Sequence, residues 1–388
     1  MYGWLFLSGV GAGLLGYTAV VTVAAQRLLQ SRRRLPPVTP ADAGLLYEDI
    51  RLQARGAALS IAAWHIPAAA ATRAIIIAHG VGGCRGKEFT VGSLDLVAQL
   101  VGSGFTVLML DLRGHGASDA ARMTYGIRER HEVLGAVDWL LAQGYAPGAI
   151  GVLGASMGGV AGMGAAGEEP AIGALISDSA CADFQAMISL HFRRQSKLPL
   201  VFLPGALLIG RLLIGENLAR LRPHELLRKL NRLPVLIIHA QGDRLVPVEH
   251  AHTLAQAGDA ELWVTDSSRH LGSFGADPRA YSQRVIQFFE RALFDRSASR
   301  GADDHTADLN QDANNAIHTT LIHELLQTDA QTPPGRSQLR MRWYTTPEGL
   351  RLRWELLPTS PESDQHQRAD DTGDSDTMAT SRIEDYVY

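Results

Sequence analysis

Apolar and polar positions between residues 45 and 295 follow a pattern of strands that alternate with helices. Two early runs, 46–53 and 58–66, alternate between apolar and polar residues, which predicts an antiparallel pair of strands. The later runs are short, rich in β-branched residues and almost wholly apolar, as expected of parallel strands covered on both faces. These later runs are 74–79, 105–111, 149–155, 172–178, 234–240 and 261–266.

Helical periodicity occupies the intervals between these runs. Over 128–143 apolar residues recur at a spacing of about 3.6 residues, and Gly144 follows as a helix terminator. Residues 248–256 and 278–293 behave similarly. This order predicts an α/β fold with a doubly wound, mostly parallel sheet and right-handed crossovers. Ligands of such sheets bind outside the carboxyl ends of the strands, so chemistry is expected on the loops there.

The interval between the runs at 172–178 and 234–240 is too long for a simple crossover. We therefore expect a helical cap, inserted at about 182–230. Within it, residues 198–215 contain one charged side chain, Arg211. Two prolines in that stretch favour short cap helices over a second membrane span.

The first 26 residues contain no charged side chain. About 20 such residues span the hydrocarbon of a bilayer, and Arg27 and an arginine triplet at 32–34 follow them. The positive-inside bias then places the N-terminus outside and the rest of the chain in the cytoplasm. Residues 1–26 are thus predicted to be a single-pass anchor in the cell membrane, and 27–44 a basic, proline-rich linker.

Two other interpretations of the N-terminal segment remain open. The small residues at 23–25 suit a signal peptidase, although no basic region precedes the apolar run. The anchor and the signal peptide differ in whether residues 1–26 are retained or cleaved. A buried core helix is the other alternative, against which the glycine-rich, uncharged composition argues.

The composition changes after the predicted catalytic domain at 45–295. Residues 296–388 are predicted to be a polar, partly disordered extension. Within it, 316–327 has the pattern of one short helix. Alternation around the turn residues of 339–357 predicts a β-hairpin.

Overall composition excludes several classes of protein. The 388 residues are 46% hydrophobic and 20% charged, which is typical of a globular protein with a sizeable core. A net charge of −4 gives no support to a nucleic-acid binder. Two cysteines, Cys84 and Cys181, cannot make a disulfide framework, and no Cys/His cluster has zinc spacing. The composition does not indicate any particular oligomeric state.

A G-x-S-x-G motif, residues 154–158, lies where the run at 149–155 passes into a helical segment. Such a turn forces its serine into a strained backbone conformation and exposes the hydroxyl above the sheet. Ser156 is therefore the candidate nucleophile. The backbone N–H of Met157, at the positive end of the helix, is a candidate donor to an oxyanion.

A serine hydroxyl is a weak nucleophile until a base takes its proton. His270 follows the run at 261–266, and Asp243 follows the run at 234–240, so each lies after a separate strand. The order Ser, Asp, His is the order of the triad in this kind of sheet. We expect His270 to act as base and then acid, and Asp243 to hold its tautomer. Asp266, four residues before His270, is the rival acid.

The glycine-rich stretch 79–83 follows the run at 74–79. Its glycines let the backbone approach a ligand closely, and the N–H of Val81 is the expected second oxyanion donor. His79 is expected to be structural, and Cys84 to be a spectator thiol because Ser156 already serves as nucleophile.

Residues 47–293 resemble the α/β-hydrolase superfamily. The matching motifs are HGVGG (79–83), DLRGHGASD (111–119), GASMGG (154–159), GDRLVP (242–247) and SSRH (267–270). The anchor makes the chain look most like the membrane-anchored serine hydrolases of that superfamily. The resemblance implies hydrolysis of an ester, thioester or amide without a metal or organic cofactor. It also implies that Asp111 and Arg113 hold a structural loop over the site. Relatives that cleave haloalkanes or epoxides have an aspartate in place of Ser156, so those reactions are not expected.

The sequence thus predicts a membrane-anchored serine hydrolase that cleaves carboxylic ester or thioester bonds. The apolar cap, with Arg193, Arg194 and Lys197 beside its apolar stretch, favours a lipid-like acyl substrate taken from the bilayer surface. A serine peptidase or amidase, and an acyltransferase, are alternatives on the same fold. A non-catalytic, membrane-tethered binding module is the alternative from a different class.

Overall fold

The chain forms two compact units, Met1–Ala307 and Asp308–Tyr388. The first contains all the residues of the candidate site. The computed structural model describes residues 2–31, 33–89, 92–230, 232–301, 339–346 and 349–356.

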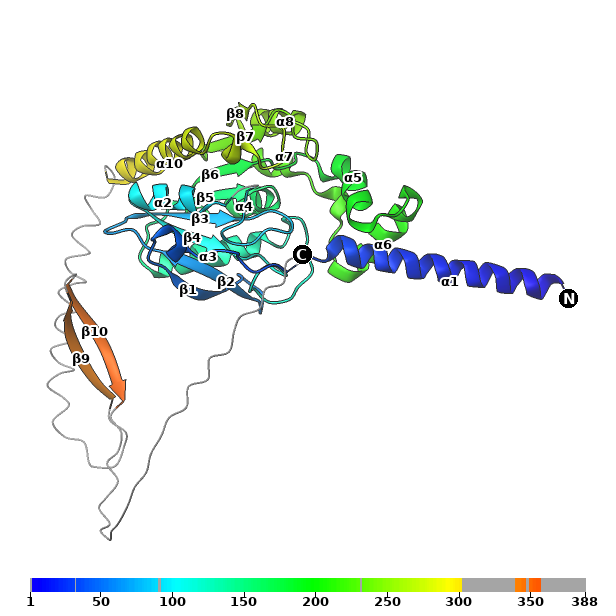
Figure 1. Ribbon diagram of the computed structural model, residues 1–388, viewed down its shortest axis with the longest axis horizontal. Helices are drawn as coiled ribbons and strands as arrows, with labels where there is room; N and C mark the ends of the chain where they lie inside the picture. The colour runs from blue at the N-terminus through cyan, green and yellow to red at the C-terminus, as the bar shows by residue number, and fades with distance from the viewer. Residues whose placement is uncertain are drawn as a thin grey trace, which may run out of the picture. The chain divides into compact units, whose positions relative to one another are not determined.

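An eight-stranded sheet forms the centre of the first unit (Figure 1). The strand order is β1-β2-β4-β3-β5-β6-β7-β8. Strand β2 is antiparallel to both of its neighbours, and all the other pairs are parallel. The predicted doubly wound, mostly parallel sheet is confirmed. The strands are β1 (Glu48–Gln53), β2 (Ser60–Ile66), β3 (Arg73–Ala78), β4 (Phe105–Leu110), β5 (Ile150–Ala155), β6 (Ile172–Asp178), β7 (Val235–Ala240) and β8 (Glu261–Thr265).

Helices cover both faces of this sheet, which explains why the central strands are almost wholly apolar. On β3, Ile75 and Ile77 belong to one hydrophobic cluster and Ile76 to the other, as the alternation of side chains across a strand requires. The cluster of Ile75 includes residues of α2 and α10, and that of Ile76 includes residues of α3, α4 and α8. The helices are α2 (Leu94–Gly102), α3 (Arg130–Ala142), α4 (Met157–Glu168), α8 (Glu249–Gly258) and α10 (Pro278–Gly301); α9 (Ser273–Ala276) and the short η1 (Pro40–Ala43) complete this part of the unit.

A helical cap is inserted between β6 and β7, as the length of that interval predicts (Figure 1). The Asp183 side chain caps its first helix by accepting a hydrogen bond of 2.7 Å from the backbone N–H of Gln185. The cap then bends by 109° between that helix and the next. Its elements are α5 (Phe184–Ser196), η2 (Leu200–Phe202), α6 (Leu203–Ile214), η3 (Leu218–Arg220) and α7 (Pro223–Leu227).

The first helix, α1 (Tyr2–Leu29), extends beyond the predicted segment 1–26. Residues 11–19 are exposed, whereas in the later turns Val21, Ala24 and Ala25 are buried against the cap. Leu28 and Leu29 are fully buried in the main core. Their carbonyl groups accept hydrogen bonds from the Tyr125 hydroxyl, at 2.9 Å, and from the Met123 N–H, at 2.8 Å. The end of α1 is therefore part of the folded unit.

Within α1, residues Gly11–Leu29 form one helix long and apolar enough to cross a membrane. The second unit contains an antiparallel pair, β9 (Leu339–Thr346) and β10 (Gly349–Leu356), in which Thr346 lies opposite Gly349. The helix predicted at 316–327 lies outside the described residues.

Candidate active site

Ser156 connects the end of β5 to the start of α4. Its backbone has φ 53° and ψ −110°, a positive φ that a non-glycine residue rarely adopts. The Ser156 N–H donates a hydrogen bond of 2.7 Å to the Asp178 carbonyl at the end of the neighbouring strand. The turn is tightly enclosed: a Cβ atom at Gly154 would collide with the Gly158 backbone, and one at Gly158 with the Ala78 carbonyl. These contacts hold Ser156 in its strained conformation above the sheet.

His270 lies in the loop after β8 and faces Ser156. The Ser156 Oγ is 3.0 Å from His270 Nε2, and His270 Nδ1 is 2.7 Å from Asp243 Oδ2. A carboxylate only accepts hydrogen bonds, so Nδ1 carries the proton toward Asp243 and Nε2 faces the hydroxyl as an acceptor. Three side chains from three separate strand ends thus meet in one hydrogen-bonded row.

Asp243 is held on both of its oxygens in the loop after β7. Oδ2 faces His270, and Oδ1 accepts hydrogen bonds from the N–H groups of Leu245, at 2.7 Å, and Val246, at 3.0 Å. Burial by itself would raise the pKa of Asp243, but the hydrogen bond and charge of His270 outweigh it, so the pKa is lowered. Asp243 therefore stays ionised at neutral pH.

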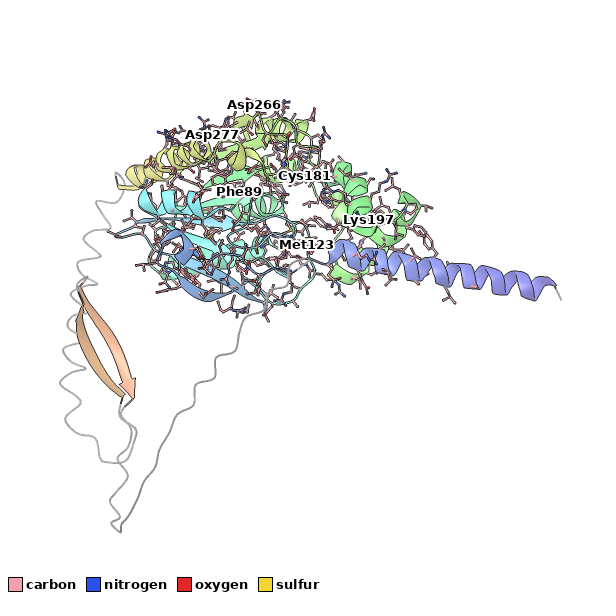
Figure 2. The ribbon with its side chains drawn as sticks, viewed as in Figure 1. Phe89, Met123, Cys181, Lys197, Asp266 and Asp277 are labelled. Carbon is pink, nitrogen blue, oxygen red and sulfur yellow. The ribbon has the colours of Figure 1, made fainter. Side chains whose placement is uncertain are left out.

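The rival acid, Asp266, lies at the surface (Figure 2). It is exposed, and the Nδ1 atom of His270 is already bonded to Asp243. The structure thus pairs His270 with the acid from the separate strand end.

The two backbone groups predicted to stabilise an oxyanion belong to the first residue of α4 and to the stretch that follows β3. Met157 is the first residue of α4, so its N–H has no acceptor within that helix. Val81 follows Gly80, where a Cβ atom would lie 3.1 Å from the Ser156 Cβ. The next N–H, of Gly82, donates to His115 Nε2 at 3.2 Å. We call this stretch, residues 80–83, the oxyanion loop.

Buried polar residues hold the loops around the site. His79 donates from Nδ1 to the Gly80 carbonyl at 2.8 Å, and its Nε2 accepts from the Leu112 N–H at 3.0 Å. Burial lowers the pKa of His79 to about 3, so the ring is neutral. Asp111 accepts hydrogen bonds from the N–H groups of Arg85 and Ala117, at 2.8 and 2.9 Å. These contacts match the structural roles expected of His79 and Asp111.

Arg113 forms a buried ion pair with Glu132 on α3, which ties its loop to the covering helices. Cys84 is buried, and burial raises the pKa of its thiol to about 11. Burial likewise raises the pKa of Cys181 to about 12. Both thiols therefore stay protonated at neutral pH, which makes them poor nucleophiles.

His191, which no motif in the sequence marks, lies on the cap near the row of three side chains. Its ring lies 5.7 Å from the Tyr125 ring and 5.6 Å from the Phe184 ring. Burial and, second, the charge of His270 lower the pKa of His191 to about 4, so it is neutral. Phe184 and His191 are seven residues apart on α5, and that helical spacing was the signal that both lie on one face of the helix.

Asp178, at the end of β6, is a second acid near the site, and no motif in the sequence marks it. Its side chain accepts hydrogen bonds from the Ser179 hydroxyl at 2.8 Å and the Tyr281 hydroxyl at 2.9 Å. Both carboxylate oxygens are thereby engaged away from His270. Among the described residues no group of three or more His, Cys, Asp or Glu side chains is placed to hold a metal ion.

Part of the chain matches a known protein family, and a larger part matches a curated protein. The model of the X-Pro dipeptidyl-peptidase (S15) family matches residues 39–197, which include the serine turn but end before Asp243 and His270. The uncharacterised protein YqkD of Bacillus subtilis (strain 168) is 28% identical over 235 residues, covering 59% of this chain and 75% of that protein.

Among solved structures, the esterase Pf2001 of Pyrococcus furiosus is similar with a TM-score of 0.57 and 24% identity, covering 68% of this chain and 98% of that one. The acylaminoacyl peptidase of Pyrococcus horikoshii has a TM-score of 0.52 and 17% identity, covering 67% and 44%. The α/β hydrolase GrgF from Penicillium sp. sh18 has a TM-score of 0.51 and 18% identity, covering 64% and 99%. At these identities the likeness establishes the fold. The strand order and these likenesses show that the chain has the fold of the α/β hydrolases, as the resemblance seen in the sequence implies, and Ser156 lies between β5 and α4 of that fold.

Proposed function

We propose that the protein is a membrane-anchored serine hydrolase that cleaves the ester or thioester bond of an apolar acyl substrate. The observation that carries this proposal is the hydrogen-bonded row from Ser156 through His270 to Asp243, with contacts of 3.0 and 2.7 Å. Nucleophile, base and orienting acid are within the distances that acyl transfer requires.

In the proposed reaction the Ser156 Oγ attacks the carbonyl carbon of the substrate as its proton passes to His270 Nε2. The N–H groups of Val81 and Met157 stabilise the negative charge that develops on the carbonyl oxygen. The bond to the leaving alcohol or thiol then breaks, and His270 protonates that group. Water attacks the acyl-enzyme next; it gives a proton to His270, the acid is released, and Ser156 Oγ regains its proton.

Packing of α1 supports a retained anchor rather than a cleaved signal peptide. Val21, Ala24 and Ala25 are buried against Phe192 and Ala206 of the cap in one hydrophobic cluster. Cleavage after the small residues at 23–25 would remove these three side chains and expose the cap surface they cover. Because exposing this apolar surface to water costs free energy, the packing favours a chain that keeps residues 1–26.

The cap presents an apolar surface beside the anchor. Leu208 and Leu212 on α6 are 61% and 73% exposed, and Leu15 on α1 is 74% exposed. Apolar surface of this kind marks a membrane or ligand contact. Arg27 lies in the last turn of α1 and further arginines follow the helix, so the positive-inside bias favours a cytoplasmic catalytic unit. These features support a substrate that reaches Ser156 from the bilayer.

The test is fluorophosphonate labelling of the full chain in detergent micelles, followed by peptide mapping, with Ser156→Ala as the control. The full chain is required because α1 contributes to the core. We expect labelling at Ser156 that the variant lacks. Absence of labelling in folded protein would contradict the serine mechanism.

A second measurement tests the apolar substrate. We expect p-nitrophenyl esters of C8–C16 acids to be hydrolysed with higher kcat/KM than the acetyl and butyryl esters. A preference for the short esters would refute an apolar acyl substrate while leaving the serine mechanism intact.

Peptide hydrolysis is a second candidate function, because the X-Pro dipeptidyl-peptidase model matches residues 39–197. The same Ser156 chemistry cleaves amides. A higher kcat/KM for X-Pro p-nitroanilides than for p-nitrophenyl octanoate would favour this candidate over the esterase.

A further inference from the structure

A strongly basic pocket of 870 Å³ adjoins the candidate active site. Its charged side chains come from two distant stretches of the chain: Arg27 and Arg34 at and after the end of α1, and Arg194 and Lys197 on the cap. The other described residues that line it are neutral, so the described lining contributes four cations and no carboxylate. We call it the basic pocket.

The four cations have no acidic partner among the described residues. Arg55, Arg113 and Arg128, elsewhere in this unit, each pair with a carboxylate. None of the four pocket cations forms such a pair within the part of the chain that the structure describes; Arg27 donates only a long hydrogen bond, 3.5 Å, to the Ser196 carbonyl. Uncompensated like charges around one cavity repel each other, and a bound anion would relieve that repulsion.

A neutral donor in the same pocket also lacks a partner. The Ser31 Oγ is buried and makes no hydrogen bond to any described residue. Buried hydroxyl groups are normally hydrogen-bonded, so a ligand that brings an acceptor would satisfy it. Arginine, lysine and hydroxyl donors around one cavity are the set that binds phosphate. A phosphate dianion matches four cations better than a single carboxylate does.

The basic pocket shares a wall with the candidate active site. Val81 and Gly82 of the oxyanion loop line it, and the preceding Gly80 packs directly against Ser156. A substrate whose carbonyl lies at Ser156 can therefore place a neighbouring group in the pocket.

The basic pocket also lies at the end of the apolar helix. Lys197 is on the cap, which packs against α1 (Figure 2). Arg27 and Arg34 come at the end of the span, where a membrane helix meets the lipid head groups. This position favours a phosphate carried by a lipid over one carried by a freely soluble molecule.

We propose that the basic pocket binds the phosphate of the substrate, so that the substrate is an acyl ester of a phosphate-bearing alcohol held at the membrane surface. This inference rests on the proposed function and specifies its substrate class. The phosphate interacts with Arg34, Arg194 and Lys197 while the ester carbonyl lies at Ser156.

Two substrates that differ only in the phosphate test the proposal: 1-octanoyl glycerol 3-phosphate and 1-octanoyl glycerol, with the full chain in detergent micelles. Arg194→Gln and Arg34→Gln should each lower kcat/KM for the phosphate ester about tenfold. This loss is at the lower end of what a hydrogen bond to a charged group contributes, because both arginine side chains are exposed. Hydrolysis of the neutral ester should stay within about twofold, because it makes no such hydrogen bond. Arg220→Gln, an exposed cap arginine outside the pocket, is the matched control and should change neither rate.

Equal losses on both substrates, or no loss on either, would overturn the proposal. Glycerol 3-phosphate and inorganic phosphate serve as the soluble competitors. If either inhibits cleavage of the neutral ester as strongly as the lipid phosphate does, the pocket is a general phosphate site and the lipid assignment is wrong.

Direct binding separates failure of this inference from failure of the proposed function. Ser156→Ala in the full chain removes turnover, and equilibrium binding of 1-octanoyl glycerol 3-phosphate is then measured with and without Arg194→Gln. Binding that Arg194→Gln weakens about tenfold supports the basic pocket even if wild-type protein hydrolyses neither ester. Absence of binding refutes the pocket even if neutral esters are hydrolysed.

Discussion

Asp243→Asn isolates the role of the acid because the structure dictates how the amide must lie. Oδ1 of Asp243 accepts two backbone N–H groups, of Leu245 and Val246. An NH₂ group cannot face two donors, so the amide oxygen takes that position and the NH₂ group faces His270 Nδ1, across the 2.7 Å contact. The amide therefore donates where the carboxylate accepts.

This reversal sets the expected magnitude. A donor against Nδ1 holds neutral His270 with its proton on Nε2, and Nε2 lies 3.0 Å from the Ser156 hydroxyl. In that tautomer Nε2 cannot take the serine proton. The expected loss in kcat is about 10⁴, or about 5.5 kcal/mol of activation free energy. Stability should fall by only about 1 kcal/mol, because the amide oxygen keeps both backbone hydrogen bonds.

The assay is hydrolysis of p-nitrophenyl octanoate by the full chain in detergent micelles, with the melting temperature measured on the same samples to confirm folding. Asp266→Asn is the matched control: it removes a carboxylate four residues from His270 that is exposed and outside the row. We expect it to leave kcat within about twofold of wild type. A folded Asp243→Asn variant within tenfold of wild type, or a large loss in Asp266→Asn, would refute the assignment.

Three further predictions concern the nucleophile pair, a buried acid and the contact between anchor and cap. Ser156→Ala and His270→Ala should each lower kcat by about 10⁴–10⁶, and the double variant should lose little more, since the groups act as a unit; additive losses in steady-state kinetics would contradict this. Burial raises the pKa of Glu88 from 4.5 to about 7, so its contribution to stability is fully present below pH 4.5 and is lost as the pH rises through about 7. Glu88→Gln has no carboxyl proton to lose, so its free energy of unfolding should rise relative to that of wild type by roughly 3 kcal/mol between about pH 5 and pH 8. If the melting temperatures of the two proteins change with pH in the same way, this reasoning is wrong. At Gly205 on α6 a Cβ atom would lie 2.8 Å from both the Tyr17 hydroxyl and a Val21 methyl group of α1, whereas at Gly210 it would meet only a Leu29 methyl group at 3.8 Å. Gly205→Ala should therefore lower the free energy of unfolding by about 1–3 kcal/mol, and Gly210→Ala, the control, should raise it by about 0.5–1 kcal/mol. Equal effects of these two variants in thermal unfolding would contradict the close packing of α1 against α6 at Gly205.

The sequence by itself determined the sheet and the serine turn, because both depend on patterns of residues that are close together in the chain. Strands β4 to β7 are buried along their whole length, so each must be an apolar run, and the runs are visible without any structure. The glycines around Ser156 are required by contacts within the turn and across to one neighbouring strand. The order of Ser156, Asp243 and His270 after separate strands followed from the same pattern.

Only the tertiary structure decided features that depend on contacts between distant segments. Which of Asp243 and Asp266 faces His270 is a matter of loop geometry, since both are short acids near a strand end. In the sequence, Leu28 and Leu29 only continue an apolar run into a linker. They are buried because the cap and the loop of Tyr125 fold against them.

The basic pocket shows the same limit most clearly. Arg27 and Arg194 are separated by well over a hundred residues, and in the sequence each looks like an ordinary solvated arginine. Folding brings them to one cavity beside the oxyanion loop, where no described acidic residue pairs with them. Long-range electrostatics of this kind leave no periodic signal in a sequence, because the charges interact through the fold rather than along the chain.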